Sequence, residues 1–254
     1  MSPGDRRRSI MPHHGFKTIF PVLSLFMSAP AIPAAERTPR TDARLQATIE
    51  RELGEDAPGV QVDVEDGNVT LRGTVRTLYD RQRAADLVQK VHGVGSVRNE
   101  LAVARADSDA GVAEEVAAQV RHYAYFGIFD DVSVQVRDGV VTLTGRVTAP
   151  FKAEDLARMA ARVPGAQDVR DEVEALPSST FDDQLRHALA SAIYNDPLFF
   201  RYATDPAPPI HIVVENGEVT LTGAVGSAVE KSKAEMVARS IPGVMGVEDQ
   251  LRVE

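Results

Sequence analysis

The chain has 254 residues, of which 43% are hydrophobic and 26% are charged, with 18 glycines and 15 prolines. This composition is typical of soluble globular domains and excludes collagen-like, disordered and multi-span membrane proteins. The absence of cysteine excludes disulfide frameworks, cysteine-ligated zinc, iron–sulfur clusters and thiol catalysis. The net charge of −9 argues against nucleic acid as a partner, because phosphate binding requires a basic surface.

The N-terminal segment has the pattern of a secretory signal peptide. Arginines at 6–8 precede an apolar run over 19–27, which is too short to span a bilayer, and small residues follow it. We therefore expect a cleaved signal peptide over 1–35, a linker over 36–40 and a periplasmic mature protein. Cleavage after Ala31 and after Ala34 or Ala35 fit equally well. An uncleaved anchor or a disordered tail is the alternative.

The remainder of the chain repeats one unit three times. The segments 60–75, 132–147 and 210–225 align by eye, and their turn glycines, Gly67, Gly139 and Gly217, are 72 and then 78 residues apart. Two further sets of glycines keep the same spacings. The sequence therefore predicts three tandem repeats. Their predicted bounds are 41–105, 110–177 and 178–254.

Each repeat contains a predicted β-hairpin. The dipeptides Asp-Gly, Asp-Gly and Asn-Gly at the three turns favour two-residue hairpin turns, because both turn positions need a positive φ. Counting outward from the first turn places Val64 opposite Val69 and Val62 opposite Leu71, which gives the hairpin one apolar face. Three strand glycines, predicted to allow close approach of a backbone or helix, are Gly73, Gly145 and Gly223.

Helical spacing of apolar residues precedes and follows each hairpin. The predicted first helices are 42–53, 112–125 and 181–195, and the second helices are 78–91, 150–163 and 227–241. A third strand ends each repeat, at 97–103, 169–175 and 247–253. The fold class is therefore α+β, with three tandem α-β-β-α-β modules. In each, two helices cover one face of a three-stranded mixed sheet, with a parallel crossover to the third strand.

These motifs resemble the BON (bacterial OsmY and nodulation) domain family. The pattern is carried by 67–75 with 93–103 and by 217–225 with 243–253, whereas the middle copy departs from it at Ala166 and Val173. The resemblance covers almost all of 41–254. It implies a small non-enzymatic module of the envelope, usually periplasmic, often linked to osmotic or envelope stress, and in contact with phospholipid or envelope proteins.

The sequence contains no motif of a hydrolase, metalloprotease or nucleotide-binding loop. The four histidines beyond residue 35 are spread over the three repeats and lack metal-ligand spacing. The paired carboxylates Asp130–Asp131 and Asp182–Asp183 precede a strand and fall in the first turn of a helix, respectively, where acids are common. We therefore expect no enzymatic activity, no cofactor and no metal site.

Aromatic residues gather in two stretches, 123–129 and 194–202, which join the first helix of repeats two and three to its hairpin. Packing within or between repeats is one interpretation. The other is a surface that faces lipid or a partner, with Phe199 and Phe200 as candidate lipid contacts. Prolines in and after the second stretch predict an ordered, non-helical loop.

Basic residues on the second helix of the first repeat form the other candidate surface, namely Arg81, Arg83 and Lys90. Residues 41–105 carry nine basic and eleven acidic side chains, whereas 106–177 carry seven and thirteen and 178–254 carry six and eleven. The first repeat is the least acidic, so phospholipid contact through this helix is the leading hypothesis. The alternative is a protein-interaction adaptor or chaperone-like factor that uses the polar sheet faces or exposed sheet edges. The sequence predicts no oligomeric state.

Overall fold

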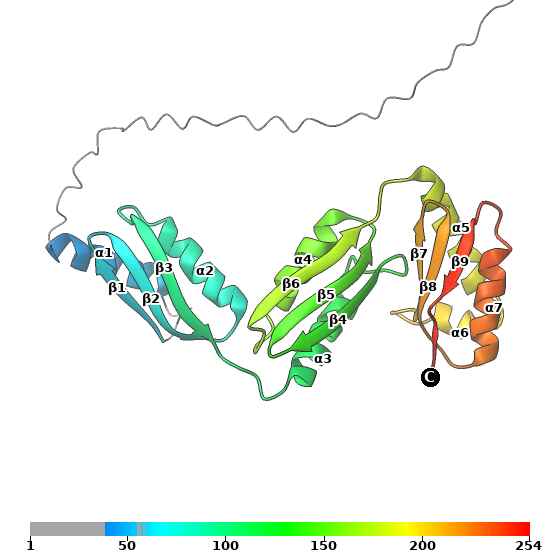
Figure 1. Cartoon of the computed structure of the whole chain (residues 1–254), viewed down its shortest axis with the longest axis horizontal. Helices are drawn as coiled ribbons and strands as arrows, with labels where there is room; N and C mark the ends of the chain where they lie inside the picture. The colour runs from blue at the N-terminus through cyan, green and yellow to red at the C-terminus, as the bar shows by residue number, and fades with distance from the viewer. Residues whose placement is uncertain (1–38, 55–56, 58) are drawn as a thin grey trace, which may run out of the picture. The chain divides into compact units, whose positions relative to one another are not determined.

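The computed structural model of the chain describes residues 39–54, 57 and 59–254 (Figure 1). The predicted signal peptide, residues 1–35, lies outside the described residues. The described residues form three modules, and modules 1 and 2 have the predicted order of helices and strands, which confirms the α+β fold class. They are called modules 1, 2 and 3 below.

Helix and strand bounds follow the prediction to within a few residues. Module 1 contains α1 (Pro39–Leu53), β1 (Val60–Glu65), β2 (Asn68–Val75), α2 (Leu78–Gln89) and β3 (Ser96–Val103). Module 2 contains α3 (Asp109–His122), β4 (Asp131–Arg137), β5 (Val140–Val147), α4 (Pro150–Ala160) and β6 (Asp168–Ala175). Module 3 contains α5 (Thr180–Tyr194), α6 (Phe200–Ala203), β7 (Ile210–Glu215), β8 (Glu218–Val225), α7 (Ala228–Arg239), β9 (Gly246–Asp249) and β10 (Arg252–Val253).

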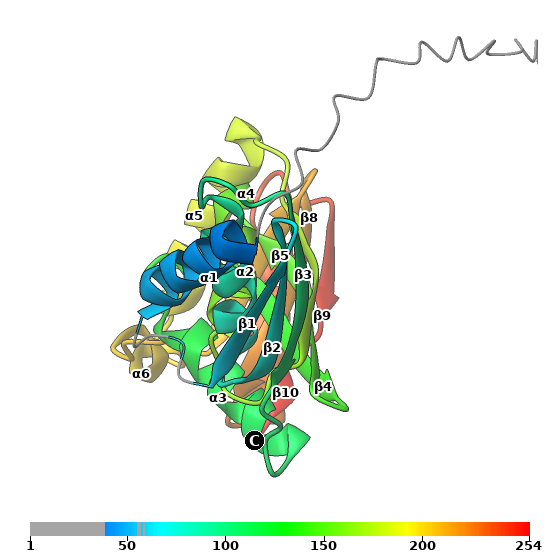
Figure 2. The same ribbon diagram turned by 90° about the vertical axis from the view of Figure 1, so that its left-hand side faces the viewer.

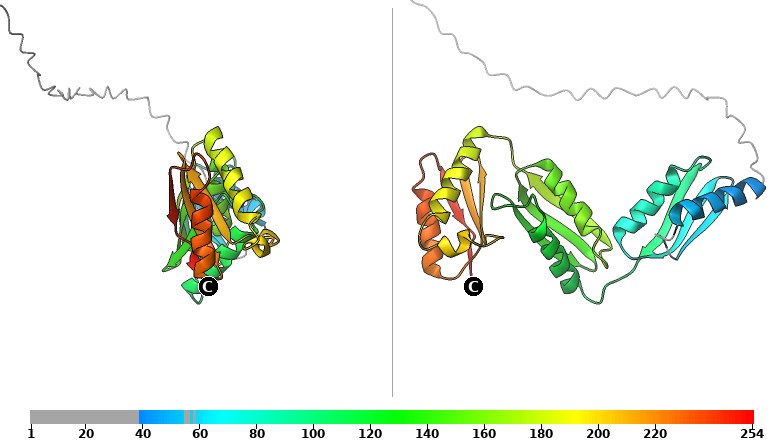
Figure 3. Two further views of the ribbon diagram at one scale, coloured as in Figure 1. Left: turned by 90° about the vertical axis from the view of Figure 1, so that its right-hand side faces the viewer. Right: turned by 180° about the vertical axis from the view of Figure 1, so that it is seen from behind.

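The second strand of each module is central in its sheet. It pairs antiparallel with the first strand and parallel with the third, so each sheet is mixed. The predicted hairpin register is confirmed, with Val62 opposite Leu71 and Val64 opposite Val69. Figure 2 shows α1 and α2 on the same side of the first sheet, and the right-hand view of Figure 3 shows the helices in front of their sheets.

Each module encloses its own apolar core between the two helices and one sheet face. In module 1 the core joins Leu45 and Ile49 of α1 to Leu71 of β2, Val88 of α2 and Leu101 of β3. Modules 2 and 3 have equivalent cores. In module 1 the other sheet face is polar, with Gln61, Asp63 and Arg72 exposed, whereas Val213 and Thr222 on that face of module 3 are buried.

Glycine is required at the hairpin turns and at one strand position of each module. In the module 2 turn, Asp138 and Gly139 have φ angles of 52° and 77°, as the dipeptide predicts. At Gly145 the backbone has φ +130°, and a Cβ would stand 2.1 Å from the carbonyl oxygen of Asp131. The predicted close backbone approach at this strand position is therefore confirmed, and a side chain there would collide with main chain that cannot rotate away.

Two predictions for module 3 were wrong. The third strand is interrupted at Gln250 and Leu251 and so forms β9 and β10, and Val253 is half exposed rather than core-facing. The segment expected to be a non-helical loop contains the single helical turn α6, because Pro197 lies before that turn and leaves its N–H groups intact.

Candidate functional site

The described residues provide neither a metal centre nor a membrane span. Among them, no group of three or more histidine, aspartate or glutamate side chains could hold a metal ion. Within the same residues, no helix combines the length and the apolar character needed to cross a bilayer. The candidate sites are therefore the hairpin turns, the aromatic stretches and the charged surfaces.

The first helix of each module anchors the hairpin turn through one aspartate. Its two carboxylate oxygens accept the backbone N–H groups of both turn residues, at 2.8–3.2 Å. This contact explains the acid at the start of each helix, including the Asp182 that the sequence analysis assigned to helix-terminal electrostatics. The three sets are Asp42 with Asp66 and Gly67, Asp109 with Asp138 and Gly139, and Asp182 with Asn216 and Gly217.

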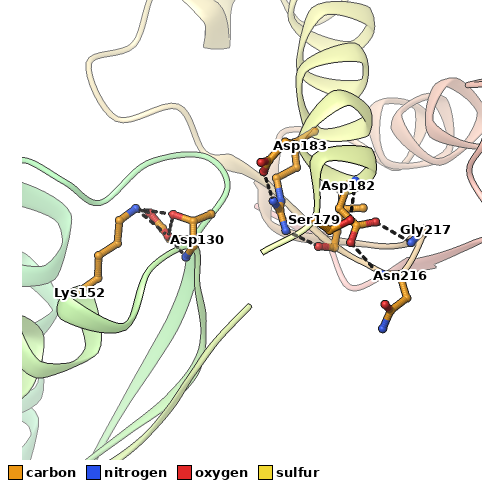
Figure 4. Close-up of polar contacts among 10 residues, drawn as sticks. Asp130, Lys152, Ser179, Asp182, Asp183, Asn216 and Gly217 are labelled. Atoms are coloured by element: carbon orange, nitrogen blue, oxygen red, sulfur yellow. Dashed lines mark hydrogen bonds and ion pairs between the residues drawn. The ribbon is translucent and has the colours of Figure 1, made fainter. Parts of the chain in front are cut away.

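The module 3 anchor, drawn in Figure 4, is the most buried of the three. Asp182 is 2% exposed, and its backbone N–H donates to the hydroxyl oxygen of Ser179. Burial opposes ionisation of this carboxyl, but the N–H groups of Gly217 and Asn216 outweigh that effect and hold the pKa of Asp182 below its usual range. The carboxylate is therefore charged at neutral pH and serves the fold.

Module 2 has a buried ion pair between its aromatic loop and its second helix. Asp130 is 1% exposed, and its carboxylate lies 2.7 Å from the Lys152 ammonium near the start of α4 (Figure 4). The same carboxylate accepts the N–H groups of Gly127 and Thr148 and the Thr148 hydroxyl. The partners of this carboxylate all come from within the module, so the Asp130 side chain fixes the loop.

Module 3 has an equivalent contact with the charges exchanged. The Glu230 carboxylate near the start of α7 accepts the Arg201 guanidinium at 2.7 Å, the Tyr202 hydroxyl at 2.7 Å and the Gly226 N–H at 2.8 Å. Burial opposes ionisation, yet these donors together hold the pKa of Glu230 below its usual range. This network ties the α6 segment to α7.

The two predicted lipid contacts in the second aromatic stretch are in different environments. Phe199 is fully buried in the module 3 core, whereas Phe200 is 65% exposed. Phe199 therefore leaves the set of candidate surface residues, and Phe200 stays in it. The correction follows from α6, because the helical turn directs consecutive side chains to different sides.

The first aromatic stretch, 123–129, is partly exposed on the surface of module 2. Tyr125 is 63% exposed and stands edge-to-face with Phe151 of α4, at 5.6 Å between ring centroids. The neighbouring Tyr123 donates its hydroxyl to Asp155, and burial together with this bond raises the pKa of Tyr123 to about 12. One stretch therefore supplies both an anchor to α4 and an exposed aromatic pair.

The predicted basic residues of α2 do not share one face. Arg83 and Lys90 lie seven residues apart and point the same way, but Arg81 lies about 200° around the helix from Arg83. Asp86 stands three residues after Arg83 and four before Lys90, so a carboxylate lies between them. The α2 set is therefore divided between two sides of the helix, with an acid among its basic residues.

The first helix of module 1 carries a better aligned basic face, which the sequence analysis missed. Arg40, Arg44 and Arg51 are spaced by four and seven residues, lie on the side opposite the core-facing Leu45 and Ile49, and are all exposed. None of the three forms an ion pair with another residue in the described part of the chain. We call them the α1 arginine ridge. The predicted helix began at 42, which separated Arg40 from its partners.

Comparisons with known proteins give one family. The BON domain model matches residues 41–105, 108–177 and 182–254. Osmotically-inducible protein Y of Escherichia coli (strain K12) is 29% identical over 126 residues, which cover 49% of this chain and 62%, less than two thirds, of that protein.

Two solved structures of secretion-system proteins also align. The C-terminal domain of CdsD, a structural protein of the Type III secretion system of Chlamydia trachomatis, is 20% identical with a TM-score of 0.25, over 81% of this chain and 95% of that one. The PrgH periplasmic domain is 12% identical with a TM-score of 0.22, over 82% of this chain and 98% of that one.

Proposed function

The chain belongs to the BON domain family, and we propose that it is a non-catalytic periplasmic protein of the bacterial envelope that binds anionic phospholipid surfaces under osmotic stress. The name of its Escherichia coli relative, an osmotically inducible protein, supports the stress assignment. The proposed binding element is module 1.

The α1 arginine ridge carries this proposal. Three exposed guanidinium groups face one way on a helix whose other side is held in the core. Each basic residue near an anionic bilayer contributes about 1 kcal/mol, so three together amount to roughly a hundredfold in affinity at low salt. Residues 41–105 also have the smallest net negative charge of the three repeats, which lowers repulsion from the bilayer.

Vesicle sedimentation tests the proposal. The full chain is mixed with vesicles of phosphatidylethanolamine and phosphatidylglycerol, or with neutral phosphatidylcholine vesicles, at low and high salt. We expect binding to the anionic vesicles only, and we expect it to weaken as salt rises. Equal binding to both compositions, or none to either, contradicts the proposal.

Matched variants then locate the surface. Arg40/Arg44/Arg51→Gln removes three charges from the ridge, and Arg121/Arg137/Arg170→Gln removes three from exposed positions of module 2. The two variants have the same net charge, so a loss confined to the ridge variant assigns the site. Arg81/Arg83/Lys90→Gln tests the α2 set in the same way. Unchanged far-UV circular dichroism establishes that each variant is folded.

An adaptor function is the second candidate. The exposed edge-to-face pair of Tyr125 and Phe151 favours it, since aromatic side chains are enriched where proteins meet. If the protein does not bind vesicles, a photoreactive group placed at Tyr125 tests the adaptor function. Crosslinking from this group to an envelope protein would support that function, and Phe151→Ser should then reduce the crosslinking.

A further inference from the structure

The hairpin turn of module 3 differs chemically from the other two turns. Asn216–Gly217 is the only Asn-Gly dipeptide in the chain, whereas modules 1 and 2 have Asp-Gly at this place. Asn-Gly is the dipeptide in which spontaneous loss of the side-chain amide is least hindered, because glycine has no side chain to obstruct ring closure. The module 3 turn is therefore a potential modification site.

The reaction needs only water. The backbone nitrogen of Gly217, after losing its proton, attacks Cγ of Asn216. A bond from this nitrogen to Cγ forms, the bond from Cγ to Nδ2 breaks, and ammonia leaves with the proton. Water then opens the succinimide ring at either carbonyl and gives aspartate or isoaspartate at 216. Nothing is oxidised or reduced.

The structure holds the attacking nitrogen in an unreactive state. The Gly217 N–H is buried and donates to Oδ1 of Asp182 at 2.8 Å, while the Asn216 N–H donates to Oδ2 at 3.0 Å (Figure 4). A negative carboxylate beside this nitrogen disfavours its deprotonation, since two like charges would then lie within hydrogen-bond distance. Asp182 is also too weak a base to remove an amide proton.

The reacting side chain has no such protection. Asn216 is exposed, and its carboxamide points away from Asp182 in Figure 4. The barrier to reaction therefore rests on the backbone contact and not on burial of the amide group. Loss of the contact between α5 and the turn would free the Gly217 nitrogen.

We propose that Asn216 is a latent deamidation site and that Asp182 suppresses the reaction while α5 is docked on the hairpin. Conversion to aspartate reproduces the turn chemistry of modules 1 and 2. Conversion to isoaspartate adds one methylene to the backbone at the residue that sets the register of β7 and β8, so it should disrupt module 3. Deamidation of Asn216 therefore marks chains in which α5 has detached from the module 3 hairpin.

The test follows residue 216 in the full chain during prolonged warm incubation at mildly alkaline pH. Peptide mass spectrometry measures loss of the amide, and isoaspartyl methyltransferase labelling measures isoaspartate. Asp182→Asn keeps the size of the anchor without its charge. We expect deamidation about tenfold faster than in the wild type, the change that loss of a charge-assisted hydrogen bond produces. Asn216→Asp should release no ammonia from this site.

Two controls separate the anchor from general unfolding. Asp109→Asn removes the equivalent anchor of module 2 and should leave residue 216 unchanged. Leu189→Ala destabilises the module 3 core without touching the turn. At equal folded fraction Asp182→Asn should react faster than Leu189→Ala. Equal rates for these two variants, or a rate for Asp182→Asn at or below that of the wild type, would overturn the proposal.

A wild-type measurement covers the case in which Asp182→Asn does not fold. Hydrogen exchange of the Gly217 N–H and deamidation of Asn216 are followed together as urea is increased. We expect the two rates to rise in parallel, because both require release of this N–H from Asp182. Deamidation that proceeds while the Gly217 N–H remains protected would overturn the proposal.

Discussion

Lys152 and Glu230 occupy the same position in two modules and carry opposite charges. Each is the third residue of the second helix, in α4 and α7 respectively, and each pairs with the segment between the first helix and the hairpin. Lys152 pairs with Asp130, and Glu230 pairs with Arg201. The contact is therefore a shared property of the two modules, although neither charge is.

The module 2 pair is expected to be the more important for stability, because both its members are largely buried. Asp130→Ala should lower the free energy of unfolding by about 3 kcal/mol or more, since Lys152 would stay buried without its counter-ion. Arg72→Ala is the control, because Arg72 pairs with Glu100 at an exposed site and such pairs contribute little to stability. Urea denaturation measures both, and similar losses for the two variants would contradict this ranking.

The Glu230 network should make module 3 sensitive to acid. The pKa of Glu230 is lowered from its ordinary value of 4.5, so the stabilisation is fully present above that pH and is lost as the pH falls through the folded-state pKa. Urea denaturation between neutral pH and strong acid, followed at amide signals of β8 by NMR, measures the effect. Glu230→Gln should be less stable at neutral pH and should show a shallower loss in acid. If the unfolding free energy of Glu230→Gln falls with decreasing pH as steeply as that of the wild type, Glu230 is not the cause of the acid sensitivity.

The hairpin anchors should rank by their burial. Asp182→Ala leaves two turn N–H groups without an acceptor at a buried site and should cost about 2–3 kcal/mol of module stability. Asp109 is exposed, so water can replace its carboxylate and Asp109→Ala should cost about 1 kcal/mol. Thermal unfolding of the two variants, each compared with its own module in the wild type, measures the difference. The reverse order would contradict the burial argument.

The sequence was sufficient to predict the hairpins, their register and the apolar faces that form the three cores. Val62, Val64, Val69 and Leu71 alternate with polar residues, and the Asp-Gly turn between them fixes which pairs face each other. Local patterns of this kind need no knowledge of distant contacts. The same is true of the first and second helices, whose apolar residues recur at helical spacing.

Contacts between distant residues could not be predicted in this way. Asp109 is thirty residues from Gly139, and nothing in its neighbourhood distinguishes a turn anchor from an ordinary helix-terminal acid. Phe199 and Phe200 are adjacent in sequence, and only the course of α6 decides which one enters the core. The α1 arginine ridge was predictable in principle from its period, once the helix was extended to Pro39.

The strand glycine of module 2 provides a test of backbone packing. Gly145→Ala should destabilise the module by a few kcal/mol, because its Cβ would stand 2.1 Å from the Asp131 carbonyl oxygen at a strained positive φ. Gly127→Ala is the matched control, since a Cβ there meets nothing within 4 Å. Thermal unfolding of both variants compares them, and equal midpoints would contradict the close approach seen in the sheet.

The adjacent phenylalanines of module 3 should separate folding from surface contact. Phe199→Ser should unfold module 3, because losing a fully buried aromatic side chain costs about 3–5 kcal/mol. Phe200→Ser should leave the unfolding midpoint nearly unchanged, since the side chain is 65% exposed. Thermal unfolding measures both variants, and comparable losses would contradict the α6 geometry.

Vesicle binding by Phe200→Ser then decides between the two lipid surfaces. If the α1 arginine ridge alone makes the contact, this variant should sediment with anionic vesicles as the wild type does, while Arg40/Arg44/Arg51→Gln does not. Loss of binding in the folded Phe200→Ser variant would instead place an inserted aromatic side chain at the membrane. In that case binding should resist salt, because burial of an apolar ring in the bilayer interface is not screened by ions.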